Sequence, residues 1–171
     1  VGAIVPWNFP ILLAIWKIAP AVMAGCTVLL KPSPYTPLCD LKMIELAQQA
    51  FPPGVLNAVS GSDDLGKWIT SNPDINKVAF TGSTETGRHV MRSAADTIKR
   101  VTLELGGNDP AIVLPDVDAK AIAPQLFWAA FQNNAQFCNA TKRLYIHKDV
   151  YDEVRDALVE FIESNIKVGN G

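Results

Sequence analysis

The segment Lys77-Val78-Ala79-Phe80-Thr81-Gly82-Ser83-Thr84 decides the class of fold, because it reads as a short strand followed directly by a turn and a helix. The apolar run at 77–80 predicts the strand, and the helical pattern after the turn extends to about Ala95. Short apolar strands that alternate with helices of about ten residues or more are typical of βαβ units. The segment therefore predicts an open, mostly parallel α/β sheet with flanking helices.

The rest of the chain repeats this alternation on both sides of that segment. Before it, strands are expected at 1–6, 27–30 and 55–59, and helices at 11–24, 37–50 and from about 62. After it, a strand is expected at 100–104, followed by two glycines. Further strands at 111–114 and 143–147 alternate with helices at 118–131 and 150–164. We expect part of a Rossmann-like domain at 1–107 and the start of a second α/β domain at 108–171.

Composition excludes several classes of function. The 171 residues are 49% hydrophobic and 19% charged, which allows a sizeable core, and the net charge of −2 gives no reason to expect nucleic acid or a membrane surface as a partner. The three cysteines, Cys26, Cys39 and Cys138, are widely spaced and odd in number. This pattern argues against a disulfide framework and a structural metal site and suits a reducing, cytoplasmic compartment. The longest apolar stretch contains Lys17 and Pro20, so a buried helix is expected there rather than a membrane span.

The residues that follow the predicted strands are candidates for a binding site, because open α/β sheets bind ligands at the carboxyl ends of their strands. They combine an amide, a cation, glycine turns that lead into helices, and a carboxylate. In chain order they are Trp7 with Asn8, then Lys31, Gly61, Gly82 with Ser83, and Glu104.

Four of these residues, Lys31, Gly82, Ser83 and Glu104, also have a structural interpretation. Gly82 and Ser83 can bind a phosphate at a helix start, although a serine there is commonly only an N-cap. Lys31 either holds a ribose hydroxyl or phosphate, or is a solvated surface lysine. Glu104 ends an apolar strand, where an unpaired charge is costly to bury, so it is either a general base or a salt-bridged structural residue. The chain has neither G-x-G-x-x-G nor a Walker A sequence.

Cys138 is the candidate nucleophile. It lies in Gln136-Phe137-Cys138-Asn139, between a predicted helix and a predicted strand. A thiol near free backbone N–H groups favours the thiolate, whereas a lone cysteine is otherwise a small buried hydrophobe. The two histidines, His89 and His147, have polar neighbours and are expected at the surface, so a glutamate must serve if a base is needed.

Taken together, these motifs resemble the NAD(P)-dependent aldehyde dehydrogenase superfamily along essentially the whole chain. The motifs, in the order of that family, are Pro6-Trp7-Asn8-Phe9-Pro10, Lys31-Pro32-Ser33, Phe80-Thr81-Gly82-Ser83-Thr84, Leu103-Glu104-Leu105-Gly106-Gly107 and Gln136-Phe137-Cys138.

The resemblance implies a division of roles. Cys138 would attack the aldehyde, the Asn8 amide and the Cys138 backbone N–H would form the oxyanion hole, and Glu104 would activate the water that hydrolyses the thioester. Residues 1–107 would bind the cofactor, NAD or NADP with NAD slightly favoured, and 108–171 would start the catalytic domain. The implied cofactor contacts are Lys31 at the adenosine ribose, Gly82 and Ser83 at the pyrophosphate, Leu105 and Gly106 near the nicotinamide, Ile4, Val5 and Trp7 along the cofactor, and Gly61.

Three departures from the family pattern stand out. Asn108 follows the double glycine, where the family commonly has a lysine. The family often has a glutamate that bonds the ribose diol where this chain has Pro34, so the cofactor preference cannot be read from that position. Ala135 stands where a glycine is common, in the tight loop before Cys138.

Three readings of function remain open at the level of the sequence. The favoured one is oxidation of a small-molecule aldehyde to a carboxylic acid, by an enzyme that is a homo-oligomer when complete. The others are a non-catalytic protein that keeps the fold and a cofactor-free thiol esterase that uses Cys138. We also expect the isolated 171 residues, as a fragment, not to turn over aldehyde.

Overall fold

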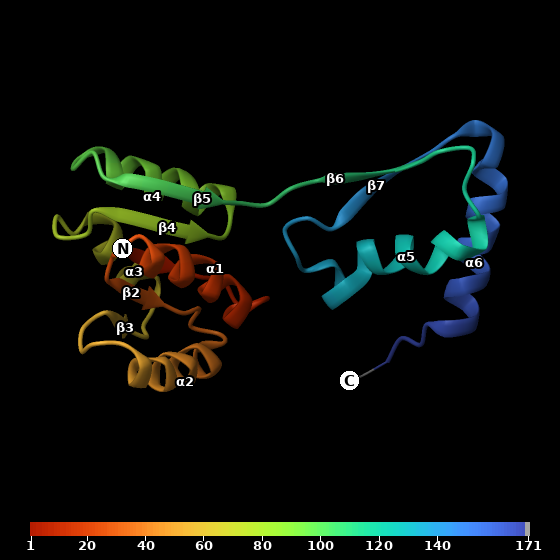
Figure 1. Cartoon of the computed structure of the whole chain (residues 1–171). Coiled ribbons are helices and arrows are strands. Elements are labelled where there is room, and N and C mark those ends of the chain that lie inside the picture. Colours follow the sequence, from red (N-terminus) through yellow and green to blue (C-terminus); the bar gives the residue numbers. More distant parts are fainter. Residues whose placement is uncertain (170–171) are drawn as a thin grey trace. The chain divides into compact units, whose positions relative to one another are not determined.

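The structure, a computed structural model, describes residues 1–169 (Figure 1). The chain divides into two compact units, unit 1 at Val1–Leu105 and unit 2 at Gly106–Gly171. Each unit has its own sheet, and its core is separate: unit 1 has two clusters of buried apolar residues and unit 2 has one. The two units are therefore described one at a time.

Unit 1 is built on a five-stranded parallel sheet. In spatial order it runs β3-β2-β1-β4-β5, and Figure 1 labels β3, β2, β4 and β5 in that order. The strands are β1 (Gly2–Ile4), β2 (Val28–Lys31), β3 (Leu56–Ala58), β4 (Lys77–Thr81) and β5 (Arg100–Glu104). The chain moves outward from β1 to β3 and then returns to the other side of β1. The direction of winding thus reverses between β1 and β4, which is the point where open α/β sheets bind their ligands.

Four helices cover the two faces of this sheet. They are α1 (Pro10–Met23), α2 (Pro37–Ala47, continued by the 3-10 turn η1 at Gln48–Ala50), α3 (Asp63–Ser71) and α4 (Thr84–Ala95). Helices α1 and α2 pack together, and so do α3 and α4. Both α1 and α2 begin with a proline, which is suited to the first helical turn because it lacks an N–H that would stay unpaired there.

The alternation of side chains along β1 separates the two cores of unit 1. Ala3 and Val5 belong to the cluster that includes buried residues of α1 and α2. Ile4 belongs to the other cluster, with Ile69 of α3 and Val90 of α4. Successive strand residues point to opposite faces, so one three-residue strand serves both cores. The central strand is accordingly fully buried.

Unit 2 is a smaller α/β arrangement. Its strands β6 (Asp109–Val113) and β7 (Thr141–Ile146) are parallel, and α5 (Ala119–Phe131) connects them through the 3-10 turn η2 (Gln132–Ala135). The turn η3 (Lys148–Val150) leads into α6 (Tyr151–Asn165), which packs on α5 around a small apolar core. Asp118 caps α5, because its carboxylate accepts hydrogen bonds from the N–H groups of Lys120 and Ala121.

The predicted fold class is confirmed, since the sheet of unit 1 is parallel and flanked by helices. Strand β5 has the predicted limits, whereas β1 is shorter than the expected 1–6. Strand β2 extends one residue further than expected and ends at Lys31, which pairs with Ile4. No helix within the described residues is long and apolar enough to span a membrane.

Candidate active site

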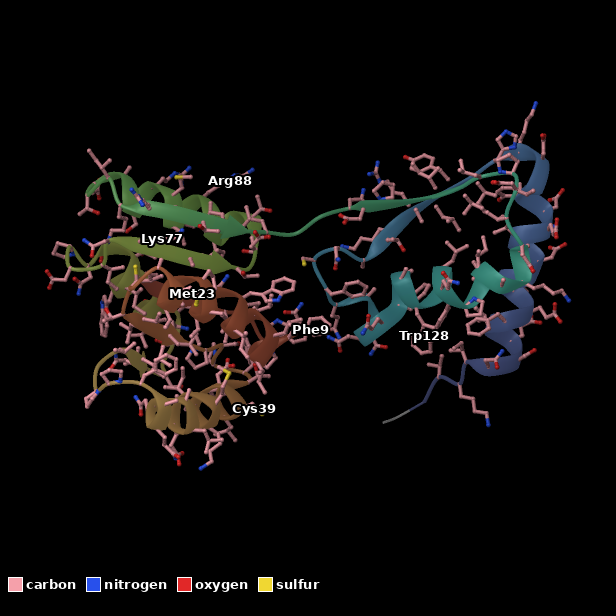
Figure 2. All side chains as sticks on the ribbon, viewed as in Figure 1. Phe9, Met23, Cys39, Lys77, Arg88 and Trp128 are labelled. Atoms are coloured by element: carbon pink, nitrogen blue, oxygen red, sulfur yellow. The ribbon has the colours of Figure 1, made fainter. Side chains whose placement is uncertain are left out.

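The carboxyl edge of the sheet in unit 1 brings together most of the candidate residues. Asn8 lies in the loop between β1 and α1, and its side-chain oxygen accepts a hydrogen bond from the N–H of Phe9 at 3.1 Å. The β4 arrow in Figure 1 points to the carboxyl edge of this sheet, and Figure 2, in the same view, labels Phe9 at that edge. The loop is also held from the β2 side, because the Thr36 hydroxyl donates to the Trp7 carbonyl at 3.3 Å.

Gly82 lies between β4 and α4 at this edge, and the core beside it leaves no room for a side chain. A Cβ at this position would lie 2.5 Å from Cζ of the buried Phe80 ring, which is closer than real Cβ contacts allow. The Gly82 N–H donates to the Glu104 carbonyl at 3.0 Å, which ties this turn to the end of β5. Glycine is thus required here by close packing.

Ser83 is the N-cap of α4. Its hydroxyl oxygen accepts a hydrogen bond from the Thr86 N–H at 3.1 Å. The structural interpretation of this serine is therefore correct, and the same geometry leaves the first turn of the helix at the switch point of the sheet. A helix start in that position is suited to bind an anionic group.

Lys31 is buried, with 3% of its surface exposed, so the surface-lysine interpretation is wrong. Its ammonium donates to the Pro32 carbonyl at 3.3 Å, and its methylene chain lies beneath Gly66 of α3. Burial lowers the pKa of Lys31, and the nearby Asp63 carboxylate opposes that shift. Helix α3 therefore covers the Lys31 side chain and shields it from solvent.

A cavity of about 550 Å³ lies over Lys31, between α3 and α4. Its floor includes Ile4 and Phe80 from the two strands at the switch point. Polar groups reach it from the first turns of both helices, Asp63 on α3 and Thr86 on α4. Further polar side chains line it along both helices, among them Ser71 and Ser93. A cavity that combines an apolar surface with placed polar groups is typical of a site for a small molecule or cofactor.

The predicted cofactor wall divides between the two faces of the sheet. Ile4 lines the cavity, whereas Val5 packs in the core with α1 and α2. Trp7 is 41% exposed in the loop after β1. Gly61 stands one residue before the N-cap of α3, packed against Leu65. Of these four residues, only Ile4 contacts the cavity between α3 and α4.

Lys17 is a member of this edge that the sequence did not single out. Although it lies in an apolar helix, it is only 7% exposed, and its ammonium donates to the Thr81 hydroxyl at 2.6 Å. Thr81 pairs with Glu104 across the strands β4 and β5. Burial lowers the pKa of Lys17, and the charge of Glu104 opposes that shift. A lone lysine within an apolar helical run was the available signal, because an unpaired charge is costly to bury.

Glu104 is more exposed than its place at the end of an apolar strand indicates. It ends β5 as predicted, but its side chain is exposed, because β5 is the outer strand of the sheet. Leu105, the next residue, packs over Gly87 of α4, where a Cβ would meet its side chain at 2.7 Å. The carboxylate is thus accessible to solvent while the chain on either side of it is held by the sheet and by α4.

Unit 2 carries Cys138, in the turn between η2 and β7. The thiol is exposed, and its sulfur lies 4.0 Å from the side-chain oxygen of Asn139. Gly107 passes close by, since a Cβ there would lie 3.0 Å from the Cys138 carbonyl. The neighbouring Gly106 is exposed, with no atom within 4 Å of a Cβ built on it. The exposure of the thiol shows that the alternative interpretation of Cys138, a small buried hydrophobe, is wrong.

The backbone before Cys138 is unusual. Asn133, Asn134 and Ala135 have φ of 51°, 54° and 61°, which is the left-handed region. Asparagine adopts this region more readily than most residues, whereas alanine pays a steric cost there. The position of Ala135 thus has the conformation that glycine favours.

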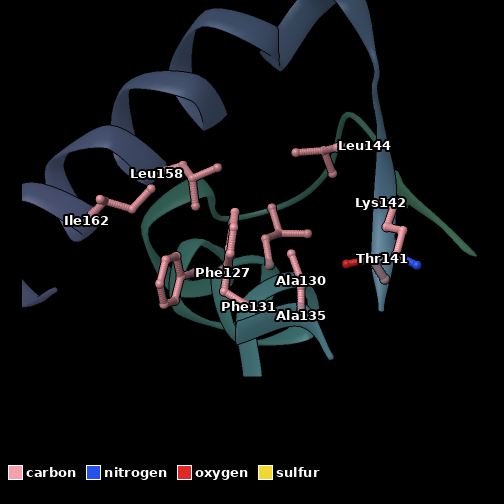
Figure 3. A pocket seen from close by; sticks show the side chains of 10 residues that line it. Phe127, Ala130, Phe131, Ala135, Thr141, Lys142, Leu144, Leu158 and Ile162 are labelled. Carbon is pink, nitrogen blue, oxygen red and sulfur yellow. The ribbon is translucent and has the colours of Figure 1, made fainter. Parts of the chain in front are cut away.

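An apolar pocket of about 330 Å³ borders this loop within unit 2 (Figure 3). Figure 3 shows Phe127 and Phe131 from α5 facing Leu158 and Ile162 from α6. Ala135 and Thr141, which stand on either side of Cys138 in the chain, complete its rim. Among the described residues, no group of three or more acidic, histidine or cysteine side chains could hold a metal ion.

Comparisons with known proteins agree on one family. The model of the aldehyde dehydrogenase family matches residues 1–171. Aldehyde dehydrogenase LUC3 of a Fusarium species is 50% identical over 160 residues, which are 94% of this chain and 34% of that protein. The crystal structure of an E. coli NADP-dependent enzyme superposes with a TM-score of 0.93 at 43% identity, over 99% of this chain and 36% of that one.

A third comparison includes the cofactor. The NAD⁺ complex of an aldehyde dehydrogenase from Bacillus cereus has a TM-score of 0.91 at 45% identity, over 98% of this chain and 34% of that one. The chain thus spans about a third of the length of the relatives that it matches.

Proposed function

Because this chain belongs to the aldehyde dehydrogenase family, we propose that it provides the cofactor-binding sheet and the nucleophile of an NAD(P)-dependent oxidation of an aldehyde to a carboxylic acid. The observation that supports this most is that one family match includes both units, and with them Asn8, Glu104 and Cys138. In this proposal unit 1 binds the cofactor and unit 2 starts the catalytic domain.

The residues of unit 1 fit a dinucleotide. The cavity between α3 and α4 has room for a nucleoside, the buried Lys31 provides a cation, and the first turn of α4 provides N–H groups for a pyrophosphate. We assign Lys31 to the ribose and Gly82 with Ser83 to the pyrophosphate. Leu105 and Gly106 are assigned to the nicotinamide end, and Ile4, Val5, Trp7 and Gly61 to the remaining contacts.

The reaction begins at Cys138. Its thiolate attacks the aldehyde carbon, so that a C–S bond forms and the carbonyl oxygen becomes an alkoxide. The side-chain amide of Asn8 and the backbone N–H of Cys138 donate hydrogen bonds to that oxygen. A nicotinamide held near Leu105 and Gly106 would supply the hydride acceptor for this step, and loss of hydride from the alkoxide carbon would leave a thioester on Cys138.

Glu104 completes the cycle. Its carboxylate takes a proton from a water molecule, which attacks the thioester carbon. The C–S bond then breaks, the carboxylic acid leaves, the Cys138 thiolate is restored, and Glu104 releases its proton to solvent. An exposed Glu104 is suited to this role, because the base must reach water. The buried Lys17, which donates a hydrogen bond to Thr81 on the neighbouring strand, lies within the electrostatic reach of Glu104 at this edge.

The test compares cofactor reduction by the purified enzyme and by matched variants. Reduction of NAD or NADP that depends on added aldehyde is expected, and Cys138→Ala should lower it by at least about a thousandfold. Cys39→Ala, which removes another exposed thiol, is the control and should leave the rate unchanged. Glu104→Gln should give one equivalent of reduced cofactor and then stop, because the thioester is not hydrolysed.

Two results would contradict the proposal. Undiminished turnover by Cys138→Ala would remove the nucleophile from the mechanism. Ester cleavage without cofactor, combined with no aldehyde-dependent reduction, would instead favour the thiol esterase.

A further inference from the structure

We propose that Asp63 makes the cavity of unit 1 select an unphosphorylated adenosine ribose, so that the chain binds NAD in preference to NADP. The inference rests on the proposed nucleotide site, and it names a residue of α3 as the determinant of cofactor choice. Two observations support it: Asp63 lines the cavity, and its carboxylate lies near the ammonium of Lys31.

The shape of the site orients the nucleotide. Phosphate groups bind at the start of α4, which lies at one end of the cavity. The adenosine must then extend into the cavity between α3 and α4, with its ribose nearest the phosphates because the ribose joins the base to them. At that end the lining residues include Lys31 at the end of β2 and Asp63, the first residue of α3.

The charges at that end cancel. Lys67 also lines the cavity, but its ammonium is engaged by Asp64 at 2.7 Å. The remaining cation, Lys31, faces the carboxylate of Asp63, which acts on it electrostatically. A 2′-phosphate would bring a charge of about −1.5 to −2 into a site with no net positive charge to receive it. The unmodified 2′-hydroxyl can instead donate a hydrogen bond to the Asp63 carboxylate.

Two further observations favour the same choice. None of the described residues that line the cavity is an arginine, the side chain best shaped to bind a phosphate by two hydrogen bonds. Pro34, which follows β2 closely, is exposed and has no side-chain acceptor for a ribose hydroxyl. Among the described lining residues, Asp63 is therefore the carboxylate that can serve this hydroxyl. Dinucleotide sites commonly use an acidic residue for this purpose when they bind NAD.

The test measures binding of two nucleotides by calorimetry, adenosine 5′-phosphate and adenosine 2′,5′-bisphosphate, so it does not depend on turnover. The purified protein should bind the first at least about tenfold more tightly than the second. Asp63→Asn should tighten binding of the bisphosphate by about tenfold, because it removes a negative charge beside the 2′-phosphate. Asp74→Asn is the matched control, since Asp74 is exposed and does not line the cavity.

Each outcome decides a different claim. If both nucleotides bind but Asp63→Asn leaves the ratio of their affinities unchanged, the role of Asp63 is wrong while the nucleotide site stands. A wild-type protein that prefers the bisphosphate overturns the inference in the same way. If neither nucleotide binds, the site itself is wrong, and the proposed cofactor role of unit 1 is lost with it.

Discussion

The carboxyl edge of the sheet in unit 1 and the cysteine loop of unit 2 hold their polar groups by different means. In unit 1 Lys17 and Lys31 are buried, and each donates a hydrogen bond to a defined acceptor. In unit 2 Cys138 is exposed and follows three residues in left-handed backbone, 133–135. Buried charges hold their places because movement would leave them unpaired, whereas the loop depends on main-chain conformation. Burial thus positions the two lysines of unit 1, and backbone geometry positions the thiol of unit 2.

The comparison predicts that added volume is tolerated differently at the packed turn after β4 and at the exposed first residue of unit 2. Gly82→Ala should lower the free energy of unfolding by about 2–3 kcal/mol, because its Cβ would meet the buried Phe80 ring at 2.5 Å. Gly106→Ala should change it by less than about 0.5 kcal/mol, since nothing lies within 4 Å of its Cβ. Urea unfolding measures both, and equal effects of the two substitutions would contradict the contrast.

Asp40 is another buried ionisable residue of unit 1, and it lies in α2 with no exposed surface. Unlike the side chains of Lys17 and Lys31, its carboxylate has no hydrogen-bond partner among the described residues. Burial raises the pKa of Asp40 from 3.8 to about 6. The folded state therefore binds the Asp40 proton more tightly than the unfolded state does. The protonated Asp40 makes its full contribution to the free energy of unfolding below pH 3.8, and this contribution is lost as the pH rises to about 6.

Asp40→Asn should remove this dependence on pH. The variant should be more stable than the wild type by about 1–2 kcal/mol at neutral pH, and the difference should shrink below about pH 4. Urea midpoints measured across this range, with Asp74→Asn as an exposed control, provide the test. A constant difference between Asp40→Asn and the wild type at all pH values would show that Asp40 is not the titrating group.

The smallest expected effect concerns the left-handed loop of unit 2. Ala135→Gly should raise the free energy of unfolding by about 0.5–1 kcal/mol, because glycine adopts a φ of 61° without steric cost. Ala130→Gly, a helical position that lines the same pocket, should instead lower it by about 1 kcal/mol. Thermal unfolding followed by circular dichroism would compare the two, and a loss of stability in both variants would argue against backbone strain at Ala135.

Local sequence patterns determined the order of strands and helices and the residues that follow each strand. The alternation of apolar strands with helices predicted the parallel sheet, and β5 was predicted with its observed limits. These features depend on local patterns, because the period of apolar residues and the placement of glycine and proline are written within each segment. The same patterns placed Gly82 and Ser83 before a helix, where the structure has them.

Tertiary structure decided which of these side chains are buried. Lys31 is covered by α3 and Lys17 is held by Thr81, which is 64 residues away in the chain. Glu104 is exposed because β5 lies at the outside of the sheet, and Asp63 reaches Lys31 because α3 crosses over β2 to reach β4. Local patterns do not encode such contacts, since the burial and electrostatics of a side chain depend on which distant segments pack against it.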